Sequence, residues 1–588
     1  MALLAGSPGA RASPVAESSG GPLPAIAVVP QPRHIWVEDG MYAWPSRVRI
    51  GAANRGEHAV AELLRAYLAE QAVTATVVDP RNGAEVVLRA GTRGGAEYAE
   101  GYGLRVDRYG VELVAKSARG LFYALQTLEQ VSDRPRGRLR SRAVAIVDGP
   151  AYRWRGIHLD VARHFFPVPV IERYIDVAAH YKLNVFHWHL TDDQAWRLES
   201  GRYPALTAGV AHYSRADVRA VVAYAARRYV TVVPELDMPA HAGAALRAYP
   251  RLACAPDTMC TDSAGAAFAQ NVLADALMDF PSPYVHAGGD EVPMPALAGQ
   301  PRFTRAIERF VESRGRRFAG WDDVLTPTLS PRALVTVWTS PQRAAAAAVH
   351  GNDVVLATGP LHFDSVQGDA AQEPRGSGHM ATLEQVYDDA IVPRGLSPAS
   401  AAHVLGAQAD VWTERIATSD HLFFMLLPRA LALAENVWTP RPLKSWDSFV
   451  ARLPAQLAWL DAHGYTFRIP NAAFALSGAQ TAFEAVPGHV QAVRAWTVAG
   501  ATTVTLSVPL TGAVVRYTSD GSVPTASSRV YRAPFTVPVG RAPVVLRARA
   551  FLRDRAGAVS ECAVVRSSVA ALRAHRGASR SWSALVSP

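Results

Sequence analysis

Short apolar segments alternate with helical segments between residues 151 and 440 of this 588-residue chain. Helical spacing of apolar side chains occurs in segments such as Val170–Tyr181, Ser214–Arg228 and Thr304–Ser313. Eight strands alternating with helices predict a (β/α)₈ barrel, although a doubly wound open sheet has the same alternation. The eight strand candidates are Arg155–Val161, Asn184–Leu190, Val230–Pro234, Tyr284–Ala287, Arg317–Trp321, Leu334–Trp338, Asp353–Ala357 and Val404–Trp412.

The residues around this alternation predict a multidomain α/β chain. We expect the barrel domain to cover residues 151–468 and to end with an amphipathic helix at Ser445–His463. Residues 25–150 mix β-rich runs with helical spacing, as in Val111–Ala115 and then Ala118–Val131. They predict a small α+β domain before the barrel.

Beyond the barrel the pattern changes to alternating strands separated by turn signals. Residues 469–567 therefore predict a β-sandwich, with strands such as Val504–Val508, Val514–Thr518 and Val544–Ala550. The two ends of the chain, 1–24 and 568–588, are polar or rich in small residues, and we expect them to be flexible.

The net charge of +9 does not indicate a nucleic-acid partner. Only Lys116, Lys182 and Lys444 are lysines among 60 basic residues, and the arginines are scattered. A nucleic-acid footprint requires clustering on one face. No apolar stretch reaches the roughly 18–20 residues of a membrane-spanning helix. We therefore expect neither a nucleic acid nor a membrane span.

The start of the chain lacks the basic and apolar regions of a signal peptide, yet residues 6–24 resemble a linker behind a cleavage site. We expect a periplasmic or secreted protein, with a cytoplasmic location left open. Cys254 and Cys260 are close enough for a small disulfide loop, and Cys562 is left odd.

Polar and aromatic side chains follow every strand candidate. A barrel gathers its catalytic groups at the carboxyl ends of its strands, so these residues predict an active-site ring. The ring contains both carboxylates and aromatic side chains. Four tryptophans could line a sugar pocket: Trp196, Trp321, Trp338 and Trp412.

The most informative pair is Asp290 and Glu291, which follow two glycines. Neighbouring side chains on a regular strand point to opposite faces, so both can serve one pocket only if the backbone turns. Gly288 and Gly289 permit that turn. Two carboxyls in one pocket suit acid–base chemistry, because each raises the proton affinity of the other.

A metal site is the alternative chemistry. His187 and His189 have the spacing that points both rings into a barrel. Together with His241 and an aspartate they could hold a divalent ion in a metallohydrolase. The tryptophans and the remaining aspartates would then be unexplained, so we expect no metal and no other cofactor.

Several motifs resemble the β-N-acetylhexosaminidases of glycoside hydrolase family 20. The resemblance extends to the α+β domain, and the C-terminal segment Tyr517-Thr-Ser-Asp-Gly-Ser-x-Pro-Thr525 looks like the chitobiase-type sandwich. The barrel motifs are Arg155-Gly-x-x-Leu-Asp-x-x-Arg163-His-Phe, Asn184-x-Phe-His-Trp-His-Leu-Thr-Asp-Asp193, Pro234-Glu-Leu-Asp-x-Pro-x-His241, Gly288-Gly-Asp-Glu-Val292, Gly320-Trp-Asp-Asp323, Gln408-x-Asp-Val-Trp-Thr-Glu414 and Pro428-Arg-Ala-x-Ala-x-Ala-Glu435.

The resemblance implies an exo-acting, retaining glycosidase that releases terminal β-linked GlcNAc or GalNAc. The sugar's own acetamide would act as nucleophile through an oxazolinium ion. Glu291 would be the general acid and base, and Asp290 would hold the acetamide N–H. Asp192 and His241 would form a hydrogen-bonded pair behind Glu291 and adjust its protonation. We expect the negative charge of Asp290 to help keep Glu291 protonated.

The resemblance also assigns the sugar-binding residues. Arg163 would hold the 3- and 4-hydroxyls, and Glu414 would bind the 4- and 6-hydroxyls. Trp321, Trp338 and Trp412 would pack around the N-acetyl methyl and the sugar ring. Asp364 would complete the pocket.

One position departs from the family pattern. His362, two residues before Asp364, stands where the family has a tyrosine that donates a hydrogen bond to the acetamido oxygen. A neutral imidazole N–H could donate the same bond with a different length and pH response. A catalytically weakened sugar-binding homologue is therefore an alternative to the active enzyme.

Overall fold

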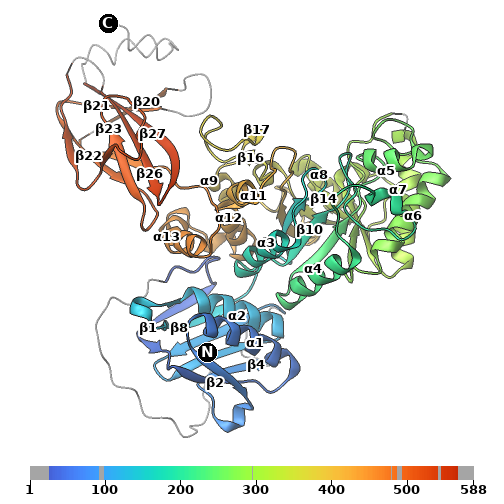
Figure 1. Cartoon of the computed structure of the whole chain (residues 1–588), viewed down its shortest axis with the longest axis horizontal. Coiled ribbons are helices and arrows are strands. Elements are labelled where there is room, and N and C mark those ends of the chain that lie inside the picture. The colour runs from blue at the N-terminus through green and yellow to red at the C-terminus, as the bar shows by residue number, and fades with distance from the viewer. Residues whose placement is uncertain are drawn as a thin grey trace. The chain divides into compact units, whose positions relative to one another are not determined.

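The computed structural model describes residues 26–91, 99–294, 296–478, 480–485, 493–540 and 544–566 (Figure 1). The ends expected to be flexible, 1–24 and 568–588, lie outside the described residues. The chain divides into two compact units. The first comprises Met1–Asp364, Glu384–Ser419 and Arg429–Arg452, and the second comprises Ser365–Leu383, Asp420–Pro428 and Leu453–Pro588.

The first unit begins with the predicted α+β domain. Helices α1 (Arg55–Glu70) and α2 (Ala118–Gln130) pack on an eight-stranded sheet. The helix expected at Ala118–Val131 is confirmed as α2. The sheet order is β1 (His34–Ala43), β8 (Arg140–Asp148), β5 (Tyr102–Asp107), β6 (Gly110–Ala115), β4 (Val86–Ala90), β2 (Arg47–Gly51) and β3 (Thr74–Val78), with β7 (Ser132–Asp133) beside β8.

The eight expected barrel strands all form, and they close into a parallel barrel. The last strand pairs with the first through Gly406 and Trp154, which rules out the open sheet. The strands are β9 (Trp154–Asp160), β10 (Val185–His189), β11 (Thr231–Glu235), β12 (Tyr284–His286), β13 (Arg317–Trp321), β14 (Leu334–Val337), β15 (Asp353–Leu356) and β18 (Val404–Ala409).

An apolar layer fills the interior of the barrel. It takes one side chain from most strands, including Trp154, Val185, Val233, Ala319 and Val355. Layers of branched and aromatic side chains make such a barrel a packed core rather than a pore. The buried polar side chains His158, His187 and Glu235 lie further along their strands, toward the carboxyl ends.

Helix α7 (Ala296–Ser313) begins earlier than the expected Thr304–Ser313. Pro301 lies inside it, and a proline usually marks a helix boundary because it lacks the N–H and crowds the preceding turn. The other helices of the first unit are α3 (Val168–His180), α4 (Arg215–Arg227), α5 (Gly243–Ala248), α6 (Ser263–Ala276), α8 (Pro341–His350), α9 (Leu383–Asp388), α10 (Pro398–Ala401) and α12 (Arg429–Trp438). Helix α11 (Ser419–Leu426) belongs almost wholly to the second unit, and α13 (Trp446–Ala462) is divided between the two units.

The second unit contains the predicted β-sandwich. Its larger sheet has the order β20 (Gln480–Ala485), β21 (Val493–Val498), β27 (Arg555–Arg566), β26 (Val544–Leu552), β23 (Val514–Thr518) and β24 (Arg529–Val530). Its smaller sheet consists of β19 (Ala473–Leu476), β22 (Thr502–Ser507) and β25 (Phe535–Val537). Val504 of the small sheet and Tyr517 of the large one belong to one core. No helix in the described part of the chain has the length and apolar character needed to cross a bilayer.

Candidate active site

Asp290 and Glu291 lie in a sharp turn after β12, as their glycines predict. Gly288 and Gly289 have positive φ angles of 66° and 96°. A Cβ on Gly288 would lie 1.5 Å from a carboxylate oxygen of Asp237, so only glycine fits there. Glu291 also has a positive φ, 51°. The side chain of Asp290 is 11% exposed and that of Glu291 is 59% exposed. One carboxyl is therefore enclosed and the other faces solvent.

His241 connects these carboxyls to Asp192. Its Nε2 lies 3.4 Å from Glu291 Oε2 and 3.6 Å from Asp290 Oδ2, and its Nδ1 lies 3.5 Å from Asp192 Oδ2. Burial lowers the pKa of His241, but the close carboxylates of Asp192 and Glu291 outweigh it and raise that pKa to about 12. His241 is therefore a cation between three carboxyls.

The expectation that Asp290 keeps Glu291 protonated is wrong for the chain without substrate. The interaction with His241 is the largest effect, and it holds the pKa of Glu291 below its usual value of 4.5. Because Glu291 is largely exposed, desolvation opposes this only in part.

Asp290 has a second acidic neighbour, Asp237, which lies in a sequence motif noted above but was given no role there. Asp237 Oδ1 accepts the backbone N–H of Gly289 at 3.0 Å. Burial, with repulsion from Asp290, raises the pKa of Asp237 well above its usual range. Burial likewise raises the pKa of Asp290, to about 6. Both aspartates therefore hold a proton more tightly than an isolated aspartic acid does, and they titrate as a coupled pair. The signal was available, since Glu235 and Asp237 are two residues apart at the end of β11.

Arg163 converges with predicted partners. Its guanidinium lies 2.7 Å from Asp192 Oδ2 and 3.8 Å from Glu414 Oε1, and 5.0 Å from the ring centre of Trp412. Asp364 raises the pKa of Glu414 together with burial, so these two carboxyls are electrostatic neighbours. The cluster of Arg163, Trp412 and Glu414 is a sugar-binding surface in chemical character: one cation, one anion and one indole.

The tryptophans divide into two groups. Trp321 and Trp412 lie 5.7 Å apart between ring centres, and Trp321 Nε1 donates to Glu235 at 2.7 Å. Trp338 Nε1 donates to Asp323 at 2.9 Å. Trp196, expected as a fourth wall residue, is instead buried against Phe268 with its Nε1 on the carbonyl of Leu198.

Asp323, the last residue of the motif Gly320-Trp-Asp-Asp323, is a second residue to which the sequence analysis assigned no role. It accepts the Trp338 indole N–H and a backbone hydrogen bond from Glu291, so one carboxyl fixes both. His362 ends the short helix η6 (Gly359–Leu361) and its backbone pairs with Asp410. This places His362 and the neighbouring Asp364 at the same end of the barrel as the residues above.

The alternative metal ligands, His187, His189 and His241, are not brought together as one group among the described residues. His187 and His189 both face Glu235 Oε2, at 3.1 and 2.7 Å, whereas His241 faces Asp192. Clusters with possible ligand atoms do exist, such as His187, Glu235 and His286. Their nitrogen atoms already lie at hydrogen-bonding distance from the carboxylate, as expected for a polar core.

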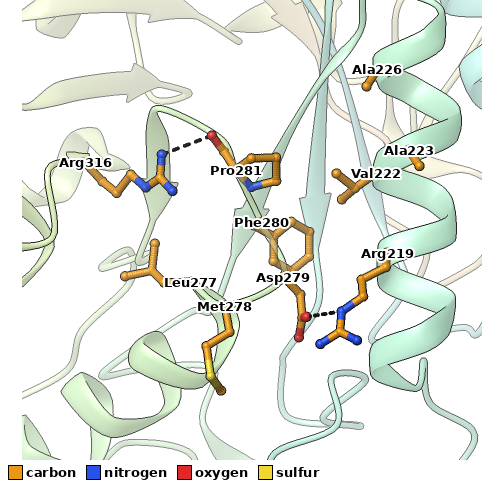
Figure 2. A pocket seen from close by; sticks show the side chains of 10 residues that line it. All are labelled: Arg219, Val222, Ala223, Ala226, Leu277, Met278, Asp279, Phe280, Pro281 and Arg316. Atoms are coloured by element: carbon orange, nitrogen blue, oxygen red, sulfur yellow. Dashed lines mark hydrogen bonds and ion pairs between the residues drawn. The ribbon is translucent and has the colours of Figure 1, made fainter.

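A cavity of about 430 Å³ lies elsewhere, against helix α4 and the segment before β12 (Figure 2). Phe280 and Pro281 precede the strand, so this hollow is at the amino ends of the strands. Its only carboxyl, Asp279, is neutralised by Arg219 at 2.6 Å. It is therefore separate from the candidate active site.

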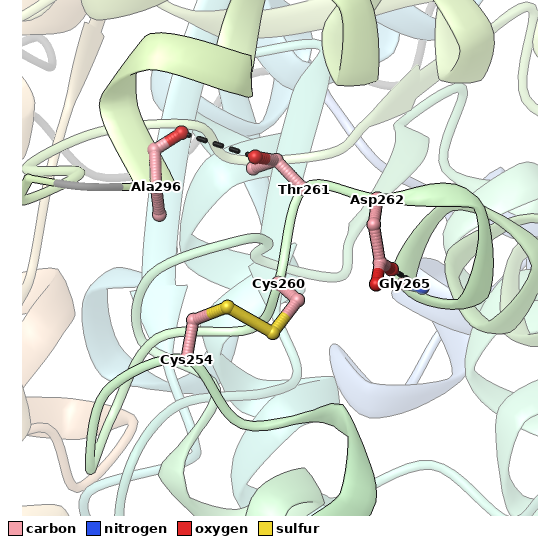
Figure 3. The surroundings of a disulfide bond; sticks show 6 residues. All are labelled: Cys254, Cys260, Thr261, Asp262, Gly265 and Ala296. Atoms are coloured by element: carbon pink, nitrogen blue, oxygen red, sulfur yellow. Dashed lines mark hydrogen bonds between the residues drawn. A yellow bond between two sulfur atoms is a disulfide. The ribbon is translucent and has the colours of Figure 1, made fainter.

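The disulfide between Cys254 and Cys260 closes a short loop (Figure 3). Backbone hydrogen bonds join this loop to the residues on either side of His241. Asp257 O accepts the N–H of Ala242 at 2.9 Å, and the N–H of Met259 donates to Pro239 O at 2.7 Å. The loop therefore holds the backbone on both sides of His241.

Replacing Cys254 and Cys260 by serine should loosen this hold. We expect the unfolding free energy to fall by about 2 kcal/mol, from the entropy of a short closed loop, and kcat/KM to fall about three- to tenfold. Thermal unfolding and kinetics on the variant measure both effects, with the unaltered chain as the reference. Loss of stability with unchanged kinetics would show that the loop does not position His241.

Fold and site together define a barrel glycosidase. Comparison with known proteins shows the family to which it belongs. Residues 152–441 match the catalytic domain of glycosyl hydrolase family 20, residues 25–149 match domain 2 of that family, and residues 493–561 match the chitobiase/β-hexosaminidase C-terminal domain. The chain belongs to glycosyl hydrolase family 20. It is a glycosidase of the β-hexosaminidase type.

The similar proteins agree. The chain is 36% identical to a β-hexosaminidase of Porphyromonas gingivalis over 75% of its own length and 61% of that protein. It is 35% identical to a β-N-acetylhexosaminidase of Cellulomonas fimi, over 62% of this chain and 79% of that one. A family 20 exo-β-N-acetylglucosaminidase from Vibrio harveyi, solved with N-acetylglucosamine, superposes with a TM-score of 0.69 at 27% identity, covering 78% of this chain and 81% of that one.

Proposed function

We propose that this chain removes terminal, non-reducing β-linked N-acetylhexosamine by substrate-assisted catalysis with retention of configuration. The observation that carries the proposal is the adjacent pair Asp290 and Glu291, one enclosed and one exposed, bridged by His241. The solved V. harveyi relative with bound N-acetylglucosamine supports the substrate class.

In the first step the acetamido carbonyl oxygen attacks the anomeric carbon, and the bond to the leaving oxygen breaks. Glu291, protonated under the bound leaving group, gives that oxygen its proton. Asp290 accepts the amide N–H and stabilises the positive charge that develops on the nitrogen. Trp321 and Trp412 would press the acetamide under the anomeric carbon, a proximity effect worth up to ~7–11 kcal/mol.

In the second step water attacks the anomeric carbon of the oxazolinium ion. The Glu291 carboxylate takes a proton from this water, and the ring C–O bond to the acetamide opens. Two displacements at one carbon return the β-configuration. Arg163 and Glu414 hold the sugar hydroxyls throughout.

Inhibition by N-acetylglucosamine-thiazoline tests this function. The compound resembles the bicyclic intermediate, and transition-state mimics bind far more tightly than substrate. We expect hydrolysis of an aryl β-N-acetylglucosaminide and inhibition by the thiazoline with a Ki well below KM. Binding of the sugar without turnover would instead identify a sugar-binding homologue.

The variant His362→Tyr tests the departure from the family pattern. A tyrosine O–H is a donor at any pH below about 10, whereas an imidazole gains a charge near pH 6.5. We expect the variant to equal or exceed the unaltered chain in kcat, with a flatter pH profile. A collapse of turnover would mean that the imidazole has its own role here.

We also propose a periplasmic or secreted location, because the disulfide of Cys254 and Cys260 is favoured in oxidising compartments. Free-thiol labelling of protein from fractionated cells tests it. Labelling of all three cysteines in a cytoplasmic fraction would contradict it.

A further inference from the structure

A polar cluster lies within the barrel directly behind the proposed acid machinery, and Glu235 is its centre. Glu235 is fully buried at the end of β11. It accepts hydrogen bonds from Trp321 Nε1 at 2.7 Å and from His189 Nδ1 at 2.7 Å, and His187 Nε2 and His286 Nδ1 lie 3.1 and 2.9 Å away. The carboxylate is thus held from three neighbouring strands.

His189, the last residue of β10, links this centre to the site. Its other nitrogen, Nε2, lies 3.1 Å from Asp192 Oδ2. A histidine that faces a carboxylate with each nitrogen donates twice and is therefore cationic. Burial lowers the pKa of His189, but Glu235 and Asp192 together raise it well above its usual range.

These contacts form one alternating chain of acids and imidazoles. The links run from Glu235 to His189 at 2.7 Å, to Asp192 at 3.1 Å, to His241 at 3.5 Å and to Glu291 at 3.4 Å. Every link pairs opposite charges. A change at the buried end therefore alters the potential at the exposed acid.

We propose that His189, clamped by Glu235, is a positioning residue that holds Asp192 as an ionised partner of His241 and so sets the pH at which Glu291 gives up its proton. This inference rests on the proposed function only for its kinetic readout.

Other charged groups surround both ends of this chain and share in its titration. Glu291 is faced by His241, Arg163, Asp192 and Asp290. Arg163 also touches Asp192, but it belongs to the proposed sugar surface. His189 is the cation outside that surface, although its ring centre lies 5.0 Å from that of Trp412. The groups that interact with His189 are His158, Asp160, His187, Asp192, Glu235, Asp237 and Asp410.

Two amide variants separate charge from hydrogen bonding. The amide of His189→Gln reaches the position of Nε2 and keeps the bond to Asp192, whereas the amide of His189→Asn reaches that of Nδ1 and keeps only the bond to Glu235. Both remove a positive charge near Asp192, whose negative charge raises the pKa of Glu291. We expect the acid limb of kcat/KM, which belongs to Glu291, to move up by about half to one pH unit in both variants.

The kcat values distinguish the variants further. We expect kcat to stay within about threefold for His189→Gln and to fall at least tenfold for His189→Asn, because Asp192 then loses its support. His158→Asn is the matched control. His158 is equally buried and 3.8 Å from Glu235, but burial keeps it neutral, so its loss removes no charge and should leave the limb in place.

An acid limb that stays at the same pH in both His189 variants, or moves equally in His158→Asn, would overturn the proposal. Neutron diffraction from the unaltered chain at pH 7 provides a test that needs neither variant nor turnover. We expect deuterium on both ring nitrogens of His189 and on one nitrogen of His158. A singly deuterated His189 would overturn the inference, whereas absent hydrolysis by the unaltered chain would overturn the proposed function alone.

Discussion

Replacing Glu291 with glutamine is expected to lower kcat/KM by about 10²–10⁴ on a disaccharide, the usual contribution of a general acid. A 4-nitrophenyl leaving group needs little protonation. The fall in kcat/KM on a 4-nitrophenyl substrate, which reports the first step, should therefore be much smaller. The pH profile should change as well. The active form requires Glu291 protonated and Asp290 ionised. With the pKa of Glu291 lowered and that of Asp290 near 6, kcat/KM should be highest between the two values.

The glutamine at position 291 cannot titrate, so the variant should follow Asp290 alone: kcat/KM rises through about pH 6 and then stays level. Steady-state kinetics from pH 3.5 to pH 8 on both substrates measure this. Glu312→Gln on helix α7 makes the same change away from the site and should leave both values intact. A disaccharide loss below about fivefold would mean that another group donates the proton.

Replacing Asp290 with asparagine is expected to lower kcat/KM by about 10²–10³, because a preorganised charge next to the reacting amide is lost. The profile should then follow Glu291 alone, so kcat/KM should decline from a lower pH than in the unaltered chain. Wild-type turnover in Asp290→Asn would contradict the assigned role.

Asp290→Asn should also stabilise the fold at neutral pH. The pKa of Asp290 in the folded chain, about 6, is raised above its usual value of 3.8, so the folded state binds this proton more tightly than the unfolded state. Stability linked to this group is therefore lost as pH rises from about 4 to 6. We expect the variant to be more stable by about 1–2 kcal/mol at pH 7 and to show no such gain at pH 4. Chemical unfolding at the two pH values measures the difference.

The barrel was predictable because its strands have a recognisable sequence pattern. Each buried strand is a short apolar run, and each ends at polar or aromatic side chains such as Asp290 or Trp412. Closure was predicted but the open sheet was left as an alternative, because the pairing of β18 with β9 joins residues some 250 positions apart, as Thr413 and Asp160 illustrate with a separation of 253. Alternation alone is equally compatible with an open sheet.

The electrostatics of the site could not be predicted from neighbouring residues in the chain. Asp290 is adjacent to Glu291, yet the cation of His241 dominates the pKa of Glu291 because its Nε2 is 3.4 Å away in space. The role of Glu235 was hidden for the same reason, since its histidine partners come from different strands. Only the closed barrel brings these groups together.

A series of aryl β-glucosaminides with N-acetyl, N-fluoroacetyl, N-difluoroacetyl and N-trifluoroacetyl groups tests whether the sugar's own amide attacks. Each fluorine withdraws electrons from the carbonyl oxygen and weakens it as a nucleophile. If the amide is the nucleophile beside Asp290, kcat/KM falls steeply along the series while the leaving group is unchanged. A series with equal rates would contradict the mechanism, because attack by an enzyme carboxylate or by water does not depend on the acyl oxygen.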